Sequence, residues 1–310
     1  MSEISRAAVI GTGTMGPGMG AVLERAGLRV TLYDVSDEAL ERAKQGVEMA
    51  RGVIERLGGE RTEGGEIRFE GDLGAALDGA DFVFEAVPEK LELKQDVFGQ
   101  FEQHVADDTV LSSNTSGIPI TKIAEGLDHP ERVIGMHWSN PPHLIPMIEV
   151  IPGERTSEET IATARELLDR IGYHASQLRK EVPGFVENRV LYAIMRECLA
   201  LVDEGVIEPE ELDLNVKWGI GYKLAVIPPM QLLDVAGLDI YESVGSYLNS
   251  DLSTESGVSE TITKLTGEGK LGLKTGGGLF SYSDEELAEL PKKRAAALVA
   301  VRKTLDQQDV

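Results

Sequence analysis

Over residues 1–182, short continuous apolar runs alternate with stretches in which apolar residues recur every three or four positions. The runs predict strands that are buried on both faces, and the recurring positions predict amphipathic helices. The predicted strands are AAVIG, LRVTLYD, IRFEGD, DFVFEAVP, TVLSSN, RVIGMHW and IEVIP, and the clearest helices cover residues 36–57, 91–104 and 158–171. We therefore expect an α/β domain that is built on a doubly wound parallel sheet.

The pattern changes at Val182-Pro183-Gly184. From Val186 to Leu201 apolar residues recur at nearly four-residue spacing, which predicts a long helix that ends at Gly205. Further helices are predicted to open at Glu208-Pro209, at Leu238-Asp239 and at Glu285, and a glycine-rich ordered loop, GEGKLGLKTGGGLFSY, precedes the last of them. The sequence thus predicts an all-helical C-terminal domain in residues 183–310.

Charge and composition exclude several classes of protein. Of the 310 residues, 53 are acidic and 30 are basic, and a net charge of −23 is the wrong sign for a surface that binds nucleic acid. The apolar runs have the length of strands, below the roughly 18 residues of a membrane span, and no secretory leader precedes the first of them. The single cysteine, Cys198, cannot form an internal disulfide, which agrees with a reducing compartment. We therefore expect a cytoplasmic protein, and from the short apolar runs one that does not contact membranes.

Three glycines, Gly11-x-Gly13-x-x-Gly16, lie between the first predicted strand and helix, and Asp34 ends the next strand. In this arrangement the first glycine permits a tight turn, the second lets a pyrophosphate approach the backbone, and the third lets the helix pack on the strand. The carboxylate can accept hydrogen bonds from both ribose hydroxyls and would repel a 2′-phosphate. The sequence therefore predicts a Rossmann domain that binds NAD rather than NADP.

A hydroxyl-rich segment, Ser112 to Gly117, follows a predicted strand at the carboxyl edge of the sheet, where open α/β sheets bind ligands. Its hydroxyl groups can hydrogen-bond a substrate oxygen. They can equally cap the helix that is expected to begin near Pro119. Spacing alone leaves both interpretations open.

His137 lies in the segment GMHWSNPPH, and Glu149 follows twelve residues later in the otherwise apolar strand MIEVI. A carboxylate that is paired with a histidine fixes its tautomer and raises its basicity, as a dehydrogenase requires for taking a proton from an alcohol. A buried pair of this kind can also be structural, and Asn140, His143 and the prolines between them can form a rigid loop. Because no two of the five histidines have i, i+4 spacing, we expect no metal site.

Six motifs resemble, in order and spacing, those of the L-3-hydroxyacyl-CoA dehydrogenases, and they extend over nearly the whole chain. They are GTGTMG with Asp34, EAVPEKLELK, SNTSG, MHWSNPP followed by Glu149, PGFVENR, and GKLGLKTGGGLFSY. The resemblance implies a general base, His137, with Glu149 as its partner, and Ser116 and Asn188 as contacts of the reacting oxygen. It also implies an active site between the two domains and a homodimer formed by the helical domain. The expected cofactor contacts are Gly11, Gly13, Thr14, Met15, Gly16, Asp34, Glu89, Lys94 and Asn114.

Other segments depart from the CoA-dependent members of this superfamily. One long helix precedes GERTEGGE in place of the longer two-helix arm that helps to hold CoA. The run NPPHLIPMIEVIPG looks more like the gulonate and carnitine branches. The segments HWSNPPH, GFVENRVLYA and WGIGYK look most like the branch that acts on free pyridine carboxylates in vitamin B6 breakdown. The segment IGYKLAVIPP resembles the gulonate branch, in which an arginine stands near the position of Lys223, so Lys223 is the expected partner of a substrate carboxylate. The other expected substrate contacts are Ser116, Ser139 and Asn140.

The sequence therefore predicts an NAD-dependent oxidoreductase that transfers hydride between NAD and a 3-hydroxy acid or its CoA thioester. One alternative is a dehydrogenase of a free small carboxylate, either a pyridine carboxylate or a gulonate- or carnitine-like hydroxy acid. Another is a folded NAD-binding protein without turnover, like the lens-crystallin relatives of the superfamily. The joint presence of His137, Glu149, Ser116 and Asn188 argues against that last alternative, because a protein without turnover has no physical need for a base and its partners.

Overall fold

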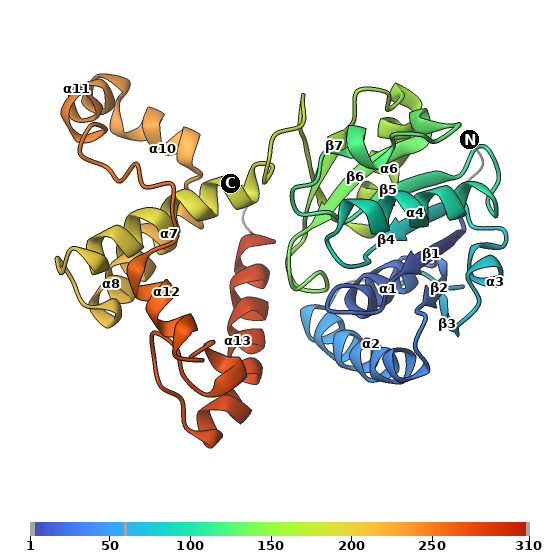
Figure 1. The fold of residues 1–310 in the computed structure, drawn as a ribbon, viewed down its shortest axis with the longest axis horizontal. Helices are drawn as coiled ribbons and strands as arrows, with labels where there is room; N and C mark the ends of the chain where they lie inside the picture. Colours follow the sequence, from blue (N-terminus) through green and yellow to red (C-terminus); the bar gives the residue numbers. More distant parts are fainter. Residues whose placement is uncertain (1–3, 59–60, 308–310) are drawn as a thin grey trace. The chain divides into compact units, whose positions relative to one another are not determined.

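The computed structural model describes residues 4–58 and 61–307, and the chain divides into two compact units, with the boundary between residues 189 and 190. The first unit contains a single sheet, whose strands are β1 (Arg6–Ile10), β2 (Arg29–Tyr33), β3 (Glu66–Glu70), β4 (Phe82–Glu85), β5 (Val110–Ser113), β6 (Val133–Trp138), β7 (Met147–Pro152) and β8 (His174–Gln177). Their order across the sheet is β3-β2-β1-β4-β5-β6-β7-β8, and Figure 1 labels all of them except β8. Strands β1 to β6 are parallel, which confirms the predicted Rossmann-like fold.

Strand β7 departs from the prediction of a wholly parallel sheet, because it runs antiparallel to β6. Residues 139–146, which connect the two strands, are fewer than the dozen or so that a parallel crossover needs. Strand β8 pairs parallel to β7, and its sequence, HASQ, contains no apolar run that would have predicted it. The reversal matters for the site because it places residues of β6 and β7 directly opposite each other.

Helices cover both faces of the sheet. On one face lie α1 (Gly16–Arg25), α2 (Asp37–Leu57) and α6 (Glu158–Ile171), and on the other lie α3 (Leu73–Leu77), α4 (Leu91–Glu102) and α5 (Ile120–Ile123). Successive strand residues point to opposite faces, so Ala7 and Val9 join the first core while Ala8 and Ile10 join the second. The three helices that the sequence predicts most clearly correspond to α2, α4 and α6.

The second unit is helical, as predicted. Its helices are the greater part of α7 (Glu187–Asp203), then α8 (Pro209–Asn215), a π-helix (Val216–Gly221), α9 (Tyr222–Leu224), α10 (Pro229–Ala236), α11 (Leu238–Leu248), α12 (Glu260–Gly267) and α13 (Asp284–Leu305). Among residues 190–307 only isolated bridges, at Gly272, Gly277 and Ser281, have strand-like pairing. Of these same residues Val299 alone is buried, so the helices enclose no core of their own. No described helix combines the length and hydropathy of a membrane span.

Candidate functional site

The glycine turn joins β1 to α1 at the point where the strand order reverses, between β1 and β4. Gly11 has a φ of +106°, and a Cβ atom there would lie 2.6 Å from the carbonyl oxygen of Ala86. A Cβ atom on Gly16 would collide with the carbonyl oxygen of Gly11, whereas one on Gly13 would meet nothing within 4 Å. The turn is tightly packed on its inner side and open on its outer side, beside the N-terminus of α1. These residues fit a dinucleotide pyrophosphate.

Asp34 lies directly after β2 and is held by the glycine turn. Its Oδ2 accepts hydrogen bonds from the backbone N–H of Thr12 at 2.9 Å and from Thr12 Oγ1 at 2.8 Å. The backbone N–H of Ser36 donates to Oδ1 at 3.3 Å. An ionised carboxylate has about four acceptor positions and three are occupied, so Oδ1 of Asp34 retains capacity for about one ribose hydroxyl. Thr14 is exposed and Met15 partly so, and both remain accessible to a ligand at the turn.

His137 in β6 and Glu149 in β7 are direct register partners. The Nδ1 atom of His137 lies 2.8 Å from Oε2 of Glu149, and the two residues are only 8% and 2% exposed. An ionised Glu149 can only accept, so Nδ1 of a neutral His137 must carry the proton in this contact. Nε2 then has a free lone pair and can accept a proton, as a general base must.

Glu149 is also bound by the backbone at the start of α7. Its Oε1 accepts hydrogen bonds from the N–H groups of Val186 at 2.8 Å and Glu187 at 3.1 Å. Gly184 and Phe185 make this possible, because left-handed φ values of +75° and +51° turn the chain so that both N–H groups face the carboxylate. Burial alone would raise the pKa of Glu149, but the hydrogen bonds from His137 and from the backbone bring it below its ordinary value.

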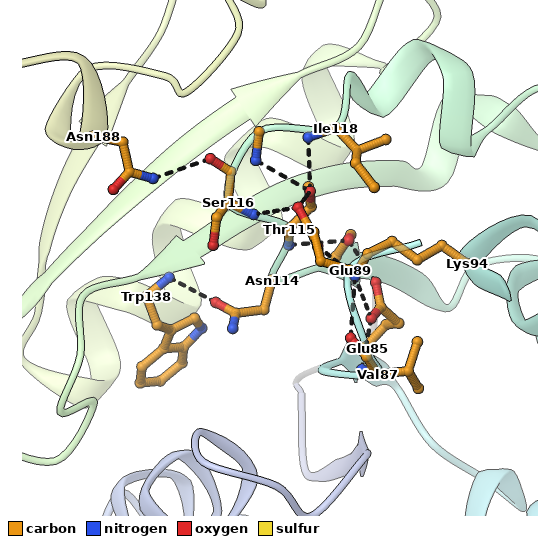
Figure 2. Close-up of polar contacts among 12 residues, drawn as sticks. Glu85, Val87, Glu89, Lys94, Asn114, Thr115, Ser116, Ile118, Trp138 and Asn188 are labelled. Carbon is orange, nitrogen blue, oxygen red and sulfur yellow. Dashed lines mark hydrogen bonds and ion pairs between the residues drawn. The ribbon is translucent and has the colours of Figure 1, made fainter. Parts of the chain in front are cut away.

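Lys94, in α4, is enclosed by carboxylates and is only 1% exposed. Its Nζ lies 2.7 Å from Oε1 of Glu85 and 3.2 Å from Oε2 of Glu89 (Figure 2). Glu85 is fully buried and also accepts from Ser113 Oγ at 2.5 Å. Burial raises the pKa of Glu85, and the Lys94 ammonium opposes that rise. The ammonium group predicted to lie along the cofactor therefore forms a buried ion pair.

Glu89 links the Lys94 ion pair to the hydroxyl-rich segment that runs from Ser112 to Gly117. Its Oε1 accepts hydrogen bonds from Thr115 Oγ1 at 2.5 Å and from the backbone N–H of Ser116 at 2.9 Å, as Figure 2 shows. Burial alone would raise the pKa of Glu89, but the hydrogen bond from Thr115 and the charge of Lys94 outweigh it, and the pKa falls. The backbone oxygen of Ser116 in turn accepts from Asn188 Nδ2 at 3.1 Å.

Asn114 is fixed from the other side, because its Oδ1 accepts from the backbone N–H of Trp138 at 2.9 Å. The helix-capping interpretation of this segment is wrong, since the N-cap of α5 is Pro119 and makes no side-chain hydrogen bond. Instead, Thr115 Oγ1 accepts from the backbone N–H of Ile118 at 2.9 Å. Thr115 therefore shapes the turn that presents Ser116.

Substitution of Thr115 tests this arrangement. We expect Thr115→Val to lower kcat/KM about 10-fold or more, because Glu89 loses a donor and the partly buried N–H of Ile118 loses its acceptor. Thr115→Ser keeps the hydroxyl group and is expected to recover most of the activity. Steady-state kinetics measure kcat/KM for both variants, and circular dichroism checks that both are folded. Equal activity of the two variants would refute a role for the hydroxyl.

The loop after β6 positions Ser139, which is 2% exposed, and Asn140, which is exposed. Ser139 Oγ donates a hydrogen bond to Oε2 of Glu187, the first residue of α7. Glu187 also has an atom within 4.8 Å of ligand atoms of both His137 and Glu149. Three such side chains could ligate one metal ion, but hydrogen bonds to one another, to Ser139 and to the backbone already engage them. Lys223 belongs to the other unit, in α9, and is exposed, so its assignment stays a prediction.

Sequence reasoning missed Glu85 and Glu187. Glu85 ends an apolar strand, FVFE, and a carboxylate in such a strand is the same signal that singled out Glu149. Glu187 has a weaker signal, a charged residue where an apolar-periodic helix begins. Its partner, Ser139, is 48 positions away and shares no motif with it.

His143 lies in the same loop and packs against α1. Its Nδ1 is buried without a hydrogen-bond partner among the described residues, and a Cβ atom on Gly18 would lie 2.8 Å from it. Burial lowers the pKa of His143 below its ordinary value of 6.5. The unfolded chain therefore binds a proton here at a higher pH than the folded protein does.

This difference predicts how stability depends on pH. The free energy of unfolding should fall as the pH drops through 6.5 toward the lower pKa of the folded state, and His143→Leu should remove that part of the loss. Between about pH 7.5 and about pH 5.5, the melting temperature should fall more steeply for the wild type than for His143→Leu. His174→Leu, at an exposed position, is the control and should leave the pH profile unchanged. A wild-type profile parallel to that of His143→Leu would contradict the assignment.

Known proteins match nearly the full length of this chain. Residues 6–182 match the family model for the 3-hydroxyacyl-CoA dehydrogenase NAD binding domain, and residues 184–282 match that for its C-terminal domain. The chain is 51% identical to the 5-formyl-3-hydroxy-2-methylpyridine 4-carboxylate 5-dehydrogenase of Mesorhizobium japonicum, over 99% of this chain and 100% of the relative.

A crystal structure of an enzyme of that name, described as an NAD+-dependent dismutase, superposes with a TM-score of 0.96 over 99% of this chain and 100% of that one, at 51% identity. A probable 3-hydroxybutyryl-CoA dehydrogenase of Deinococcus radiodurans is 36% identical over 88% of this chain and 99% of the relative.

Proposed function

The chain belongs to the 3-hydroxyacyl-CoA dehydrogenase family and is an NAD-dependent oxidoreductase, and from this premise we propose that its substrate is a free pyridine carboxylate. The reacting carbon belongs to an aldehyde or hydroxymethyl group on the pyridine ring. The observation that carries the proposal is the 51% identity to a dehydrogenase of such a compound, over essentially the full length of both chains.

The region that follows β2 favours a free acid over a CoA thioester. Among the described residues a single helix, α2, lies between β2 and β3, and the rest of that connection is loop or turn. The longer two-helix arm that the resemblance implies for CoA-dependent members has no counterpart among these described residues. A probable 3-hydroxybutyryl-CoA dehydrogenase is also markedly less similar, at 36% identity. A 3-hydroxyacyl-CoA substrate remains the second candidate, because the family as a whole is named for it.

The proposed mechanism assigns each group one task. Gly11, Gly13 and Gly16 would hold the pyrophosphate of NAD and Asp34 its ribose, and NAD when bound supplies the hydride acceptor. His137 Nε2 takes the hydroxyl proton, and Glu149 holds the ring in position and stabilises the imidazolium.

The remaining residues of the proposed site position these groups. Ser116 and Asn188 hydrogen-bond the reacting oxygen, and the contact between the Ser116 carbonyl and the Asn188 amide keeps the two residues adjacent. Lys94 acts through Glu89, which orients the segment that carries Ser116. Lys223 binds the substrate carboxylate.

Parallel assays of NADH absorbance test the substrate class. We expect turnover of pyridine carboxylates that carry a formyl or hydroxymethyl group, and at most weak turnover of 3-hydroxybutyryl-CoA. Lys223→Ala should raise KM for the carboxylates about 10-fold or more, because a charged hydrogen bond is lost. Lys264→Ala, which removes an exposed lysine of the same unit, should leave KM unchanged. Efficient oxidation of the CoA thioester, unaffected by Lys223→Ala, would refute the proposal.

We further propose that the protein is a cytoplasmic homodimer and that residues 190–310 form the subunit contact. The described part of that unit buries only Val299, while large apolar side chains such as Trp218, Met230, Tyr241 and Tyr247 are more than half exposed. Apolar surface of this kind is a feature of protein interfaces. Sedimentation equilibrium should give twice the chain mass of 33.6 kDa, and a monomer at micromolar concentration would exclude the dimer.

A further inference from the structure

Glu187 places a second carboxylate beside the His137–Glu149 pair. A carboxylate in the first turn of a helix is favoured by the helix dipole, so its place at the start of α7 alone indicates no function. Its surroundings are more informative. One of its atoms lies within 4.8 Å of ligand atoms of both His137 and Glu149, and Oε2 accepts the hydroxyl proton of Ser139.

The hydrogen bond between Ser139 and Glu187 determines what the two side chains can still bind. A serine hydroxyl has one proton, and Ser139 commits it to Glu187. The lone pairs that remain on Ser139 Oγ and on the carboxylate can only accept. Glu187 is partly exposed, whereas Ser139 and His137 are buried, so the carboxylate is the accessible member of the group. A substrate group that meets this acceptor pair must therefore donate a hydrogen bond.

On the reacting carbon itself, a second donor is uncommon. A primary or secondary alcohol has one hydroxyl on its reacting carbon, and that hydroxyl faces the base. An aldehyde in its hydrated form has two hydroxyls on that carbon, and one of them remains after the base has engaged the other. Glu187 has a carboxylate oxygen within 4.8 Å of a ring nitrogen of His137, and Ser139 is hydrogen-bonded to that carboxylate, so the acceptor pair lies beside the base.

We propose that Glu187 and Ser139 form a subsite for the second hydroxyl of a gem-diol, and that this subsite selects hydrated aldehydes for oxidation to carboxylic acids. The inference rests on the proposed function, since it concerns the same reacting carbon and the same base. It adds the chemical form of the substrate and the residues that recognise it.

The oxidation balances with the groups already assigned. One O–H bond of the diol breaks and its proton passes to His137 Nε2, while the C–H bond of the same carbon breaks and its electron pair leaves as hydride to the nicotinamide of NAD. A carbonyl forms from the deprotonated oxygen. The second hydroxyl, held by Glu187, remains on the carbon as the O–H of the carboxylic acid.

Equilibrium binding separates recognition from turnover. A pyridine carboxylate with a trifluoroacetyl group is hydrated in water and has no hydrogen on its diol carbon, so it mimics the gem-diol without reacting. By calorimetry, Glu187→Gln should weaken binding of this diol about 10- to 100-fold, because it replaces an acceptor-only carboxylate with a neutral amide. Binding of the matching hydroxymethyl compound should weaken by a clearly smaller factor. Glu158→Gln makes the same change in the first turn of α6, at an exposed position, and should alter neither.

Kinetics supply the second test. The ratio of kcat/KM for aldehyde oxidation to that for alcohol oxidation should fall about 10-fold or more in Glu187→Gln. It should fall in the same direction but less in Ser139→Ala, which leaves the carboxylate in place. Because each ratio is measured within one protein, a partial loss of folded protein does not affect it.

The other outcomes are distinguishable. An equal loss for diol and alcohol would overturn the subsite and assign Glu187 to positioning the His137–Glu149 pair, and an unchanged ratio would overturn it as well. A wild-type protein that oxidises the alcohol but never the aldehyde would leave the proposed function standing and refute this inference. A wild-type protein that is inactive on both compounds would refute both.

Discussion

His137→Gln is expected to lower kcat by about 10²- to 10⁴-fold, the usual contribution of a general base, with little change in NADH binding. Glutamine retains a polar side chain of similar reach but cannot take a proton from the substrate. The residue lies 8% exposed in β6, with Nδ1 engaged by Glu149, so that Nε2 alone remains for the chemistry. Stopped-flow and steady-state absorbance at saturating NAD measure the loss directly.

Two comparisons make this expectation specific. Glu149→Gln should lower kcat by a smaller factor than His137→Gln, because the base is present but its tautomer is no longer fixed. His174→Gln, at an exposed position in β8, should behave as wild type. If His137→Gln kept the parent turnover with its fold and cofactor affinity intact, the base would have to be another group.

Lys94→Met is expected to have the largest effect on stability, with a loss of about 3–5 kcal/mol in the free energy of unfolding. The ammonium lies 2.7 Å from Glu85, and both residues are almost completely buried. Without it the Glu85 carboxylate would remain buried with no opposite charge, or would take up a proton at the cost of its other hydrogen bonds. Urea denaturation at neutral pH measures the loss.

A double variant separates the lost partner from the lost lysine. Lys94→Met combined with Glu85→Met should recover much of the stability, since a buried ion pair is often replaceable by apolar residues of similar volume. Lys122→Met removes an exposed lysine and should change stability little. If the double variant were as unstable as Lys94→Met, packing rather than charge would explain the loss. In either case the double variant should have reduced activity, because Glu89 would lose its cation.

Hydrophobic periodicity predicted the elements of this fold well where they are long or continuous, as for α2, α6 and the first six strands. It did not predict β8, whose four residues are mostly polar, or the direction of β7, which depends on the length of the preceding loop. The pairing of His137 with Glu149 was expected from residue type and is found at 2.8 Å. Strand reversal, which that expectation did not include, is what produces it.

The placement of Glu187 beside the His137–Glu149 pair could not be predicted from local sequence, because it depends on a turn of left-handed residues and on a serine 48 positions away. The enclosure of Lys94 is a similar case. A lysine at the start of an amphipathic helix is normally solvated, and only the tertiary contact with Glu85 shows that this one is buried. Contacts between distant segments determine both residues.

The antiparallel register of β6 and β7 also bears on how the protein reaches its native state. A slip of one residue between these strands would turn Glu149 to the face that Ile148 and Val150 occupy beneath α6. There the carboxylate would meet an apolar core without a histidine or backbone donors, at a cost of several kcal/mol. The residues to which we assign the chemistry thus also penalise mispaired sheets. On this proposal, activity and correct strand pairing depend on the same two side chains.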